Sequence, residues 1–295
     1  MRNKQSKKAY STMFAMSILF PILFIILVVL GLDDQPMAIK NQVQENVPRP
    51  EVVHTEKIND KPKFNAKQRR AVGFLQSALN HFENQKWPLV VEECEKAIAA
   101  DPEMVFGHAL MGNALNVMMQ WEQAADSWRK ATELDPTSFE FYYHLGFALS
   151  QMAQDQVNNQ KKHAIGKEAI ESFETYLKLV DNEPEATQEQ MSLAHASLAA
   201  MYKLNKMAEK QELALSHFEA AAALDSNNEL AFFNLGLMYA EKYEKRGIDS
   251  DLELAIHSLE KAVQLNPTNT KYKAVLDALV GHSSPAELMA AMQQL

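Results

Sequence analysis

Cysteine, glycine-rich loops and metal-binding spacings are scarce or absent in this sequence. The single cysteine, Cys94, cannot form an intrachain disulfide, and its place in an apolar helical pattern predicts a buried, unreactive thiol. The nine histidines never show the H-x-x-x-H or H-E-x-x-H spacing of a metal site. The nine glycines are scattered and form no phosphate-binding loop. The sequence therefore predicts no catalytic residue, no cofactor and no metal site, and it argues against an enzyme.

Negative charge outweighs positive charge outside the N-terminus. The net charge is -9, although the first ten residues carry four basic side chains, Arg2, Lys4, Lys7 and Lys8. Without those four charges, the rest of the chain carries -13. Because a surface that binds nucleic acid phosphates is basic, nucleic acid is not the expected partner.

Charged residues are missing altogether from 11 to 32, where Leu, Ile, Val and Phe dominate. These 22 residues would rise about 33 Å as a helix, enough to cross the hydrocarbon core of a membrane. A cleaved signal peptide is the alternative, but its apolar region would be shorter and would end in a small-residue cleavage site. The run ends instead in Leu-Gly-Leu, followed by Asp33 and Asp34. An uncleaved transmembrane signal anchor is the favoured interpretation.

The charges that flank this span predict its orientation. The N-terminal segment 1–10 is basic, whereas Asp33 and Asp34 follow the span. The positive-inside rule places the basic side in the cytoplasm. For a bacterial protein, this predicts a single-pass protein of the inner membrane whose remaining residues lie in the periplasm. The reverse topology, with a cytosolic C-terminal region as in a mitochondrial import receptor, is the alternative.

Residues 33–66 lack apolar periodicity and read as a flexible linker. Four prolines interrupt this polar, charged stretch: Pro36, Pro48, Pro50 and Pro62. As a random coil, the linker would span roughly 30–35 Å. It would hold the rest of the chain away from the membrane surface.

The segment 105–137 carries the pattern around which the remaining chain is organised. Apolar and small residues at i, i+3, i+4 and i+7 predict two amphipathic helices joined near Gln120. Gly112 and Ala124 are small enough to let the helices cross closely, and Trp128 fills the space between this pair and the next. Pro136 ends the second helix, because proline has no backbone donor. Such a pair cannot bury its own apolar face and needs further copies.

Copies of this pattern follow one another from about residue 65 to 269. The second-helix signature recurs at Val90/Cys94/Ala97, Ala124/Trp128/Ala131, Ala169/Phe173/Tyr176, Ala214/Phe218/Ala221 and Ala255/Leu259/Ala262. The first-helix signature recurs at Met111-Gly112, Leu145-Gly146, Leu198-Ala199 and Leu235-Gly236. These motifs resemble the tetratricopeptide repeat family, whose helix-turn-helix unit has about 34 residues. The resemblance implies an all-α solenoid with a binding role and without chemistry.

The resemblance also implies the domain organisation. About five helix pairs would form a solenoid over 67–268, with repeats near 71–102, 105–136, 139–181, 192–226 and 229–267. Repeats three to five carry insertions, and the one in the third repeat, around residues 151–166, is expected to lengthen both helices of the pair and to widen their loop. Insertions in solenoids map to loops on one face and either touch a partner or do nothing. Residues 269–295 would form two helices that cap the array. The alternative is that the last helix binds a neighbour's groove through its apolar stripe of Leu288, Met289, Met292 and Leu295.

In the family that the sequence resembles, the first helices of the pairs line a concave groove. The protein-binding groove would then include Phe106, Asn113, Asn116, Tyr143, His144, Phe147, Phe233 and Asn234. Asparagine amides can hydrogen-bond an extended peptide backbone, and aromatic rings can form apolar pockets. The alternative is that some of these residues pack helix against helix. The family's basic clamp for a C-terminal carboxylate is missing, because its positions carry Leu75, Leu79, Leu110, Glu140 and His144.

An anchor, a tether and a binding fold in one chain predict a membrane-anchored scaffold or adaptor for protein partners. The architecture is similar to that of anchored bacterial repeat proteins, which favours a role in the assembly or maturation of an envelope protein complex. The alternative is a stable structural subunit of a larger membrane complex. The sequence leaves open which partner is bound and whether the chain forms a homo-oligomer.

Overall fold

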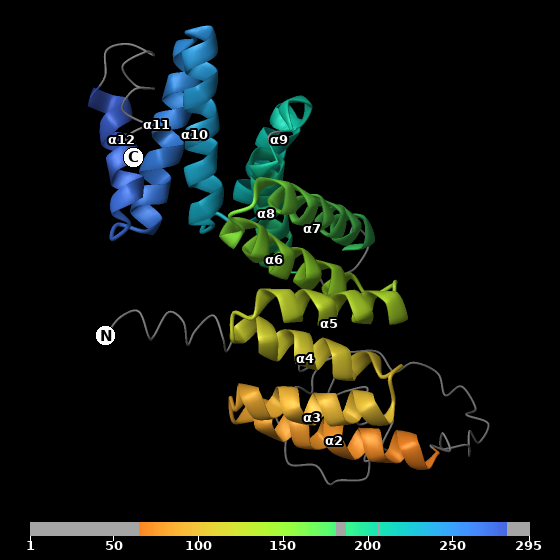
Figure 1. Cartoon of the computed structure of the whole chain (residues 1–295). Helices are drawn as coiled ribbons and strands as arrows, with labels where there is room; N and C mark the ends of the chain where they lie inside the picture. Colours follow the sequence, from red (N-terminus) through yellow and green to blue (C-terminus); the bar gives the residue numbers. More distant parts are fainter. Residues whose placement is uncertain (1–64, 181–186, 206, 282–295) are drawn as a thin grey trace, which may run out of the picture. The chain divides into compact units, whose positions relative to one another are not determined.

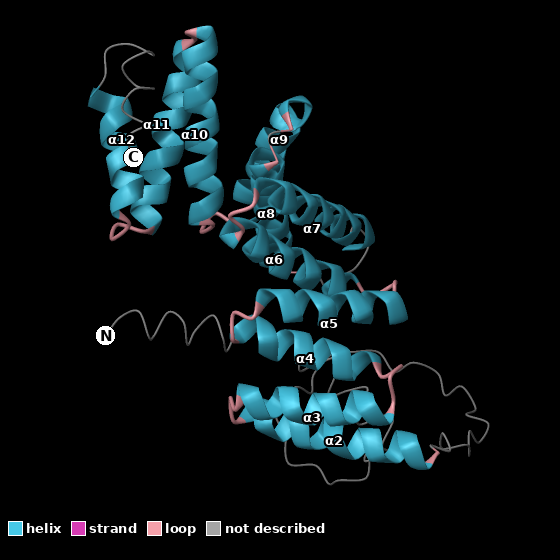
Figure 2. Ribbon diagram, viewed as in Figure 1, coloured by secondary structure: helices cyan, strands magenta, loops and turns pink. Residues whose placement is uncertain are grey.

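The computed structural model describes residues 65–180, 187–205 and 207–281 (Figure 1). These residues fold into α-helices joined by short loops, with no strand among them (Figure 2). The helices are α2 (Ala66–Glu83), α3 (Trp87–Ala100), α4 (Val105–Val117), α5 (Trp121–Leu134), α6 (Phe139–Asp155), α7 (Asn159–Val180), α8 (Gln188–Leu204), η1 (Ala208–Lys210, a 3-10 turn), α9 (Gln211–Leu224), α10 (Glu229–Arg246), α11 (Asp249–Leu265) and α12 (Thr270–Gly281). The prediction of an all-α fold is confirmed for this part of the chain.

Several predicted segments lie outside the described residues. They are the N-terminal segment 1–10, the transmembrane anchor 11–32, the linker up to residue 64 and the last predicted helix, after residue 281. Within the ranges that the structure describes, no helix combines the length and the apolar character needed to cross a membrane.

The chain divides into two compact units between Leu110 and Met111, inside α4. The first unit contains α2, α3 and the beginning of α4. Asn65 begins α2 with a capping box, in which its side chain accepts from the Gln68 backbone and the Gln68 side chain accepts in return. The apolar faces of α2 and α3 then meet, and the buried thiol of Cys94 lies among them. Burial raises the pKa of Cys94 to about 12, which confirms the prediction of an unreactive thiol.

In the second unit, a glycine on each of the first helices α4, α6 and α10 packs against a large side chain of the helix that follows. A Cβ atom added to Gly112 would lie 2.7 Å from the Trp128 ring, and one added to Gly146 would lie 3.0 Å from Phe173. At Gly236, the corresponding distance to Leu259 is 2.5 Å. Real Cβ atoms are essentially never found closer than about 3 Å to such neighbours, since interiors are already close-packed. The small-against-large pairing that the repeats predict is therefore what lets these helices cross.

The contact at Gly112 gives a first testable prediction. Gly112→Ala is expected to lower the free energy of unfolding by about 1–3 kcal/mol, because the new methyl group overlaps Trp128. Gly73→Ala is the matched control, since Gly73 lies inside α2 with no atom within 4 Å of the added Cβ. It should raise stability by about 0.5–1 kcal/mol through helix propensity alone. Urea denaturation followed by circular dichroism measures both, and equal effects of the two substitutions would contradict the close crossing.

The insertions in the third and fifth repeats are helical. Only residues 156–158 separate α6 from α7, and α7 is 22 residues long, so most of the extra sequence lengthens these two helices. In the fifth repeat, Gly247 ends α10 with φ of 62°, a left-handed conformation that favours glycine, and α11 begins at Asp249. In the fourth repeat, the added material includes the short turn η1. The insertions thus change helix length more than loop length in repeats three and five.

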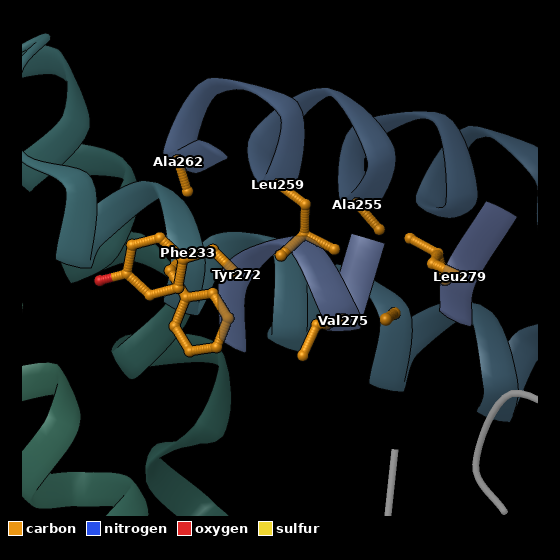
Figure 3. Close-up of a cluster of buried hydrophobic side chains, with 8 residues drawn as sticks. Phe233, Ala255, Leu259, Ala262, Tyr272, Val275 and Leu279 are labelled. Carbon is orange, nitrogen blue, oxygen red and sulfur yellow. The ribbon is translucent and has the colours of Figure 1, made fainter. Parts of the chain in front are cut away.

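The C-terminal end of the second unit is closed by α12. This helix packs on α11 and contributes Tyr272, Val275 and Leu279 to a cluster of buried apolar side chains with α10 and α11 (Figure 3). The Tyr272 ring stacks on Phe233 with ring centroids 4.4 Å apart. Residues 270–281 therefore cover the apolar face that α10 and α11 would otherwise expose.

Candidate functional site

Two asparagines on α4 are buried without protein partners for their amide groups. Asn113 and Asn116 lie nearly one turn apart in the second unit, and they are 2% and 5% exposed. The Nδ2 of Asn113 and both side-chain polar atoms of Asn116 accept or donate no hydrogen bond within the described structure. Leaving a buried amide unpaired costs about 1–3 kcal/mol. Because both asparagines leave amide atoms unpaired, this part of α4 is a candidate for binding a polar ligand such as a peptide backbone.

The three predicted groove residues on α6 lie in different surroundings. Tyr143 is buried against α7, with its ring centroid 5.4 Å from Tyr176, and burial raises the pKa of its hydroxyl. His144 stacks on Trp128 with centroids 4.7 Å apart, and burial lowers its pKa to about 3, so the ring is neutral at pH 7. Phe147 is only partly buried and meets the Trp121 ring edge-on at 5.9 Å. Of the three, Phe147 has the side chain most open to a ligand.

The predicted groove residues on α10 are occupied by contacts inside the chain. Phe233 is buried under Tyr272, as described above, and the amide of Asn234 donates to the Leu230 carbonyl at 2.9 Å. Phe106 is partly buried in the first unit.

A further pair of polar residues lies on the first helices and was not predicted from the sequence. Lys203 of α8 and Glu241 of α10 form an ion pair at 3.9 Å between the first helices of two successive repeats. Lys203 follows Ala199 by four residues, the same offset that separates Asn116 from Gly112 and Ser150 from Gly146. The repeat register could have identified Lys203 as a groove position, but the fourth repeat has Ala199 where the second repeat has Gly112. Desolvation by burial lowers the pKa of Lys203, which is three-quarters covered despite its charge.

The first helices therefore offer a mixed set of groups from α4 to α10. It comprises buried amides at Asn113 and Asn116, an aromatic ring at Phe147 and a salt bridge between Lys203 and Glu241. Leu237 continues the same register on α10, but it packs against the apolar cluster that α10 forms with α11 and α12. Amides recognise peptide bonds and apolar groups recognise side chains, whereas nothing in this set is arranged for covalent catalysis. Among the described residues, no group of three His, Cys, Asp or Glu side chains could hold a metal ion.

Comparison with known proteins identifies the fold. A family model described as TPR repeat matches residues 112–152, which include the Gly112 and Trp128 contact. A solved structure described as YrrB, a TPR protein with an unusual peptide-binding site, aligns with a TM-score of 0.52 at 20% identity, covering 69% of this chain and 90% of that one. The described helices have a tetratricopeptide-like all-α fold.

Two other solved structures are similar in fold. MamA from Desulfovibrio magneticus RS-1 aligns with a TM-score of 0.52 at 18% identity, over 69% of this chain and 99% of that one. PilW, described as a widely conserved type IV pilus biogenesis factor, aligns with a TM-score of 0.50 at 15% identity, over 76% and 91%. No curated protein matches the sequence at a significant level. At these identities the likeness establishes the fold alone.

Proposed function

We propose that this protein is a membrane-anchored adaptor whose tetratricopeptide repeats bind an extended segment of a protein partner. The observation that carries the proposal is the set of buried side-chain atoms without hydrogen-bond partners on α4: the Nδ2 of Asn113 and both the Nδ2 and the Oδ1 of Asn116. A peptide bond has one donor and one acceptor, and an asparagine amide can pair with both. YrrB, which is described as having a peptide-binding site, supports the same use of this fold.

The chemistry of the first-helix register supports an internal, partly apolar segment as the ligand. The charged groups available there, Lys203 and Glu241, already pair with each other. No basic cluster is present at the described clamp positions Leu75, Leu79, Leu110, Glu140 and His144, so a C-terminal carboxylate has no cationic partner there. The part-buried ring of Phe147 provides an apolar contact for a side chain of the partner.

We further propose that residues 11–32 anchor the protein in an inner membrane, with residues 1–10 in the cytoplasm and the repeats in the periplasm. The uncharged span and the basic residues before it support this orientation. Assembly or maturation of an envelope complex is the proposed role, and PilW, described as a pilus biogenesis factor, is a neighbour in keeping with it. Protease digestion of intact cells and spheroplasts tests the orientation. The repeats should be cleaved only after the outer membrane is opened, and protection in both preparations would overturn the topology.

Binding through the asparagine amides is tested with peptides selected from a random library against the full-length chain in detergent micelles. Asn113→Ala combined with Asn116→Ala should weaken binding of the selected peptides by about tenfold or more, because two hydrogen bonds worth about 0.5–1.5 kcal/mol each are lost. The control is Asn80→Ala, which removes an exposed amide from α2. Fluorescence anisotropy gives the dissociation constants.

A measurement of folding separates a lost contact from a lost fold. Because the Nδ2 groups of both asparagines are unpaired in the free protein, replacing the side chains should not lower the free energy of unfolding by more than about 1 kcal/mol. Peptides that bind the double variant as tightly as they bind the wild type would refute this site.

The second possible function is that of a stable structural subunit of a membrane complex. Such a subunit would depend on the sequence of residues 11–32 for its place in the complex.

A further inference from the structure

Two histidines from different helices face each other through their Nδ1 atoms. His195 of α8 and His217 of α9 have their Nδ1 atoms 2.7 Å apart, and their ring centroids are 4.9 Å apart with an angle of 35° between the planes. Both side chains are partly buried, so they are held in place but can still be reached from solvent. The two residues are 22 positions apart, which is why no local sequence motif reveals them.

Each ring of the pair brings a nitrogen to a partly buried position between α8 and α9. Neutral imidazole nitrogens have free lone pairs and are the commonest protein ligands for transition metals. In the absence of a metal, the same distance requires one ring to donate an N–H to the other.

The groups around the pair suit a cation. Glu174 of α7 is close enough to His217 to favour its charged form, and its carboxylate accepts a hydrogen bond of 2.6 Å from Tyr202. The Tyr202 ring lies 6.0 Å from His217, and Lys210 lies 5.4 Å from the centre of that ring. Glu174 supplies negative charge beside the histidines, whereas Lys210 is the nearby group that opposes a second cation.

We propose that His195 and His217 together bind a late first-row divalent cation, Zn²⁺, Ni²⁺ or Cu²⁺, that clamps α8 to α9. Imidazole nitrogens prefer these ions over Mg²⁺ or Ca²⁺. With metal–nitrogen bonds of about 2.0–2.1 Å in tetrahedral geometry, two ligand nitrogens lie about 3.3 Å apart, so the rings need to separate by only about 0.6 Å. Water completes the coordination, because no third His, Cys, Asp or Glu among the described residues is placed to join the two histidines as a ligand.

The site would act on the fourth repeat as a stabiliser rather than as a catalyst. A cation bound to both rings favours the folded helix pair, because the unfolded chain does not hold the two nitrogens together. Two protein ligands predict a dissociation constant in the micromolar range, much weaker than a four-ligand structural zinc site. This inference does not depend on peptide binding, so either can fail without the other.

The test uses the full-length protein in micelles, carrying no histidine tag and treated with a chelator. Calorimetric titration with ZnCl₂ and CuCl₂ should show one site for the wild type, and saturating Zn²⁺ should raise the melting temperature. His195→Gln and His217→Gln should each weaken binding at least tenfold. His257→Gln is the matched control, because His257 is exposed on α11 away from the pair.

Copper spectroscopy gives a readout that a merely structural role of the histidines would not produce. The electron paramagnetic resonance spectrum of the Cu²⁺ complex should show hyperfine splitting from two nitrogen ligands, which falls to one in either Gln variant. Circular dichroism establishes that the variants remain folded. Binding that is undetectable in the wild type up to millimolar metal, or that is equal in wild type and variants, would show that the pair is a hydrogen bond only.

Discussion

Trp128→Ala is expected to lower the free energy of unfolding by about 3–5 kcal/mol, the largest effect of any single substitution proposed for this chain. Trp128 is 1% exposed, lies against the bare backbone of Gly112 and stacks on His144 at 4.7 Å. Its indole nitrogen makes no hydrogen bond in the described structure, so the loss comes from packing alone. Removing the ring leaves a cavity between the second and third repeats.

A double-mutant cycle shows whether Gly112 and Trp128 act as one contact. Gly112→Ala should be destabilising in the wild type but close to neutral in the Trp128→Ala background, where the methyl group has room. Trp121→Ala serves as the control, because Trp121 is only partly buried and should cost less. Urea denaturation gives the four free energies, and strictly additive effects would refute the direct contact.

Mild acid is expected to destabilise the protein through His144. Its pKa is about 3 in the folded chain and about 6.5 in an unfolded one, so the folded state binds fewer protons between these values. The histidine's contribution is therefore complete above about pH 6.5 and is lost as the pH falls toward about 3. The slope is at most about 1.4 kcal/mol per pH unit. His195, with a pKa of about 4, adds a smaller effect in the same direction because it is less buried.

His144→Phe isolates this effect, because phenylalanine can still stack on Trp128 but cannot take up a proton. Between about pH 6.5 and pH 5, the free energy of unfolding of the variant should fall less steeply than that of the wild type. His257→Phe changes an exposed histidine and should leave the slope unchanged. Parallel wild-type and His144→Phe profiles would show that His144 is not held neutral by burial.

The helix pairs were predictable because their defining contacts are encoded locally. Gly112 and Trp128 stand a fixed number of residues apart on consecutive helices, and a pattern of small and large residues implies their contact. The burial of Cys94 followed from the same register. Helix lengths in the insertions were less predictable, since a polar stretch such as residues 156–166 reads equally well as loop or as exposed helix.

The candidate site was only partly predictable, because its contacts join helices distant in sequence. The register placed Phe147 and the two asparagines on first helices, but not which side chains another helix would cover. Phe233 is covered by Tyr272, which belongs to a helix outside the repeats. The Lys203–Glu241 and His195–His217 pairs also come from separate helices and leave no local motif. The anchor at 11–32 lies outside the described residues and stays a prediction.

Binding of a polypeptide along the first helices is tested most directly by site-specific photo-crosslinking in cells. A photoreactive phenylalanine analogue replaces Phe147 on a first helix, and Lys130 or Glu219, which are exposed on second helices, in the controls. Irradiation should join a partner polypeptide to the chain from position 147 and not from positions 130 and 219. Adducts that form only from the second-helix positions would contradict the proposed binding face.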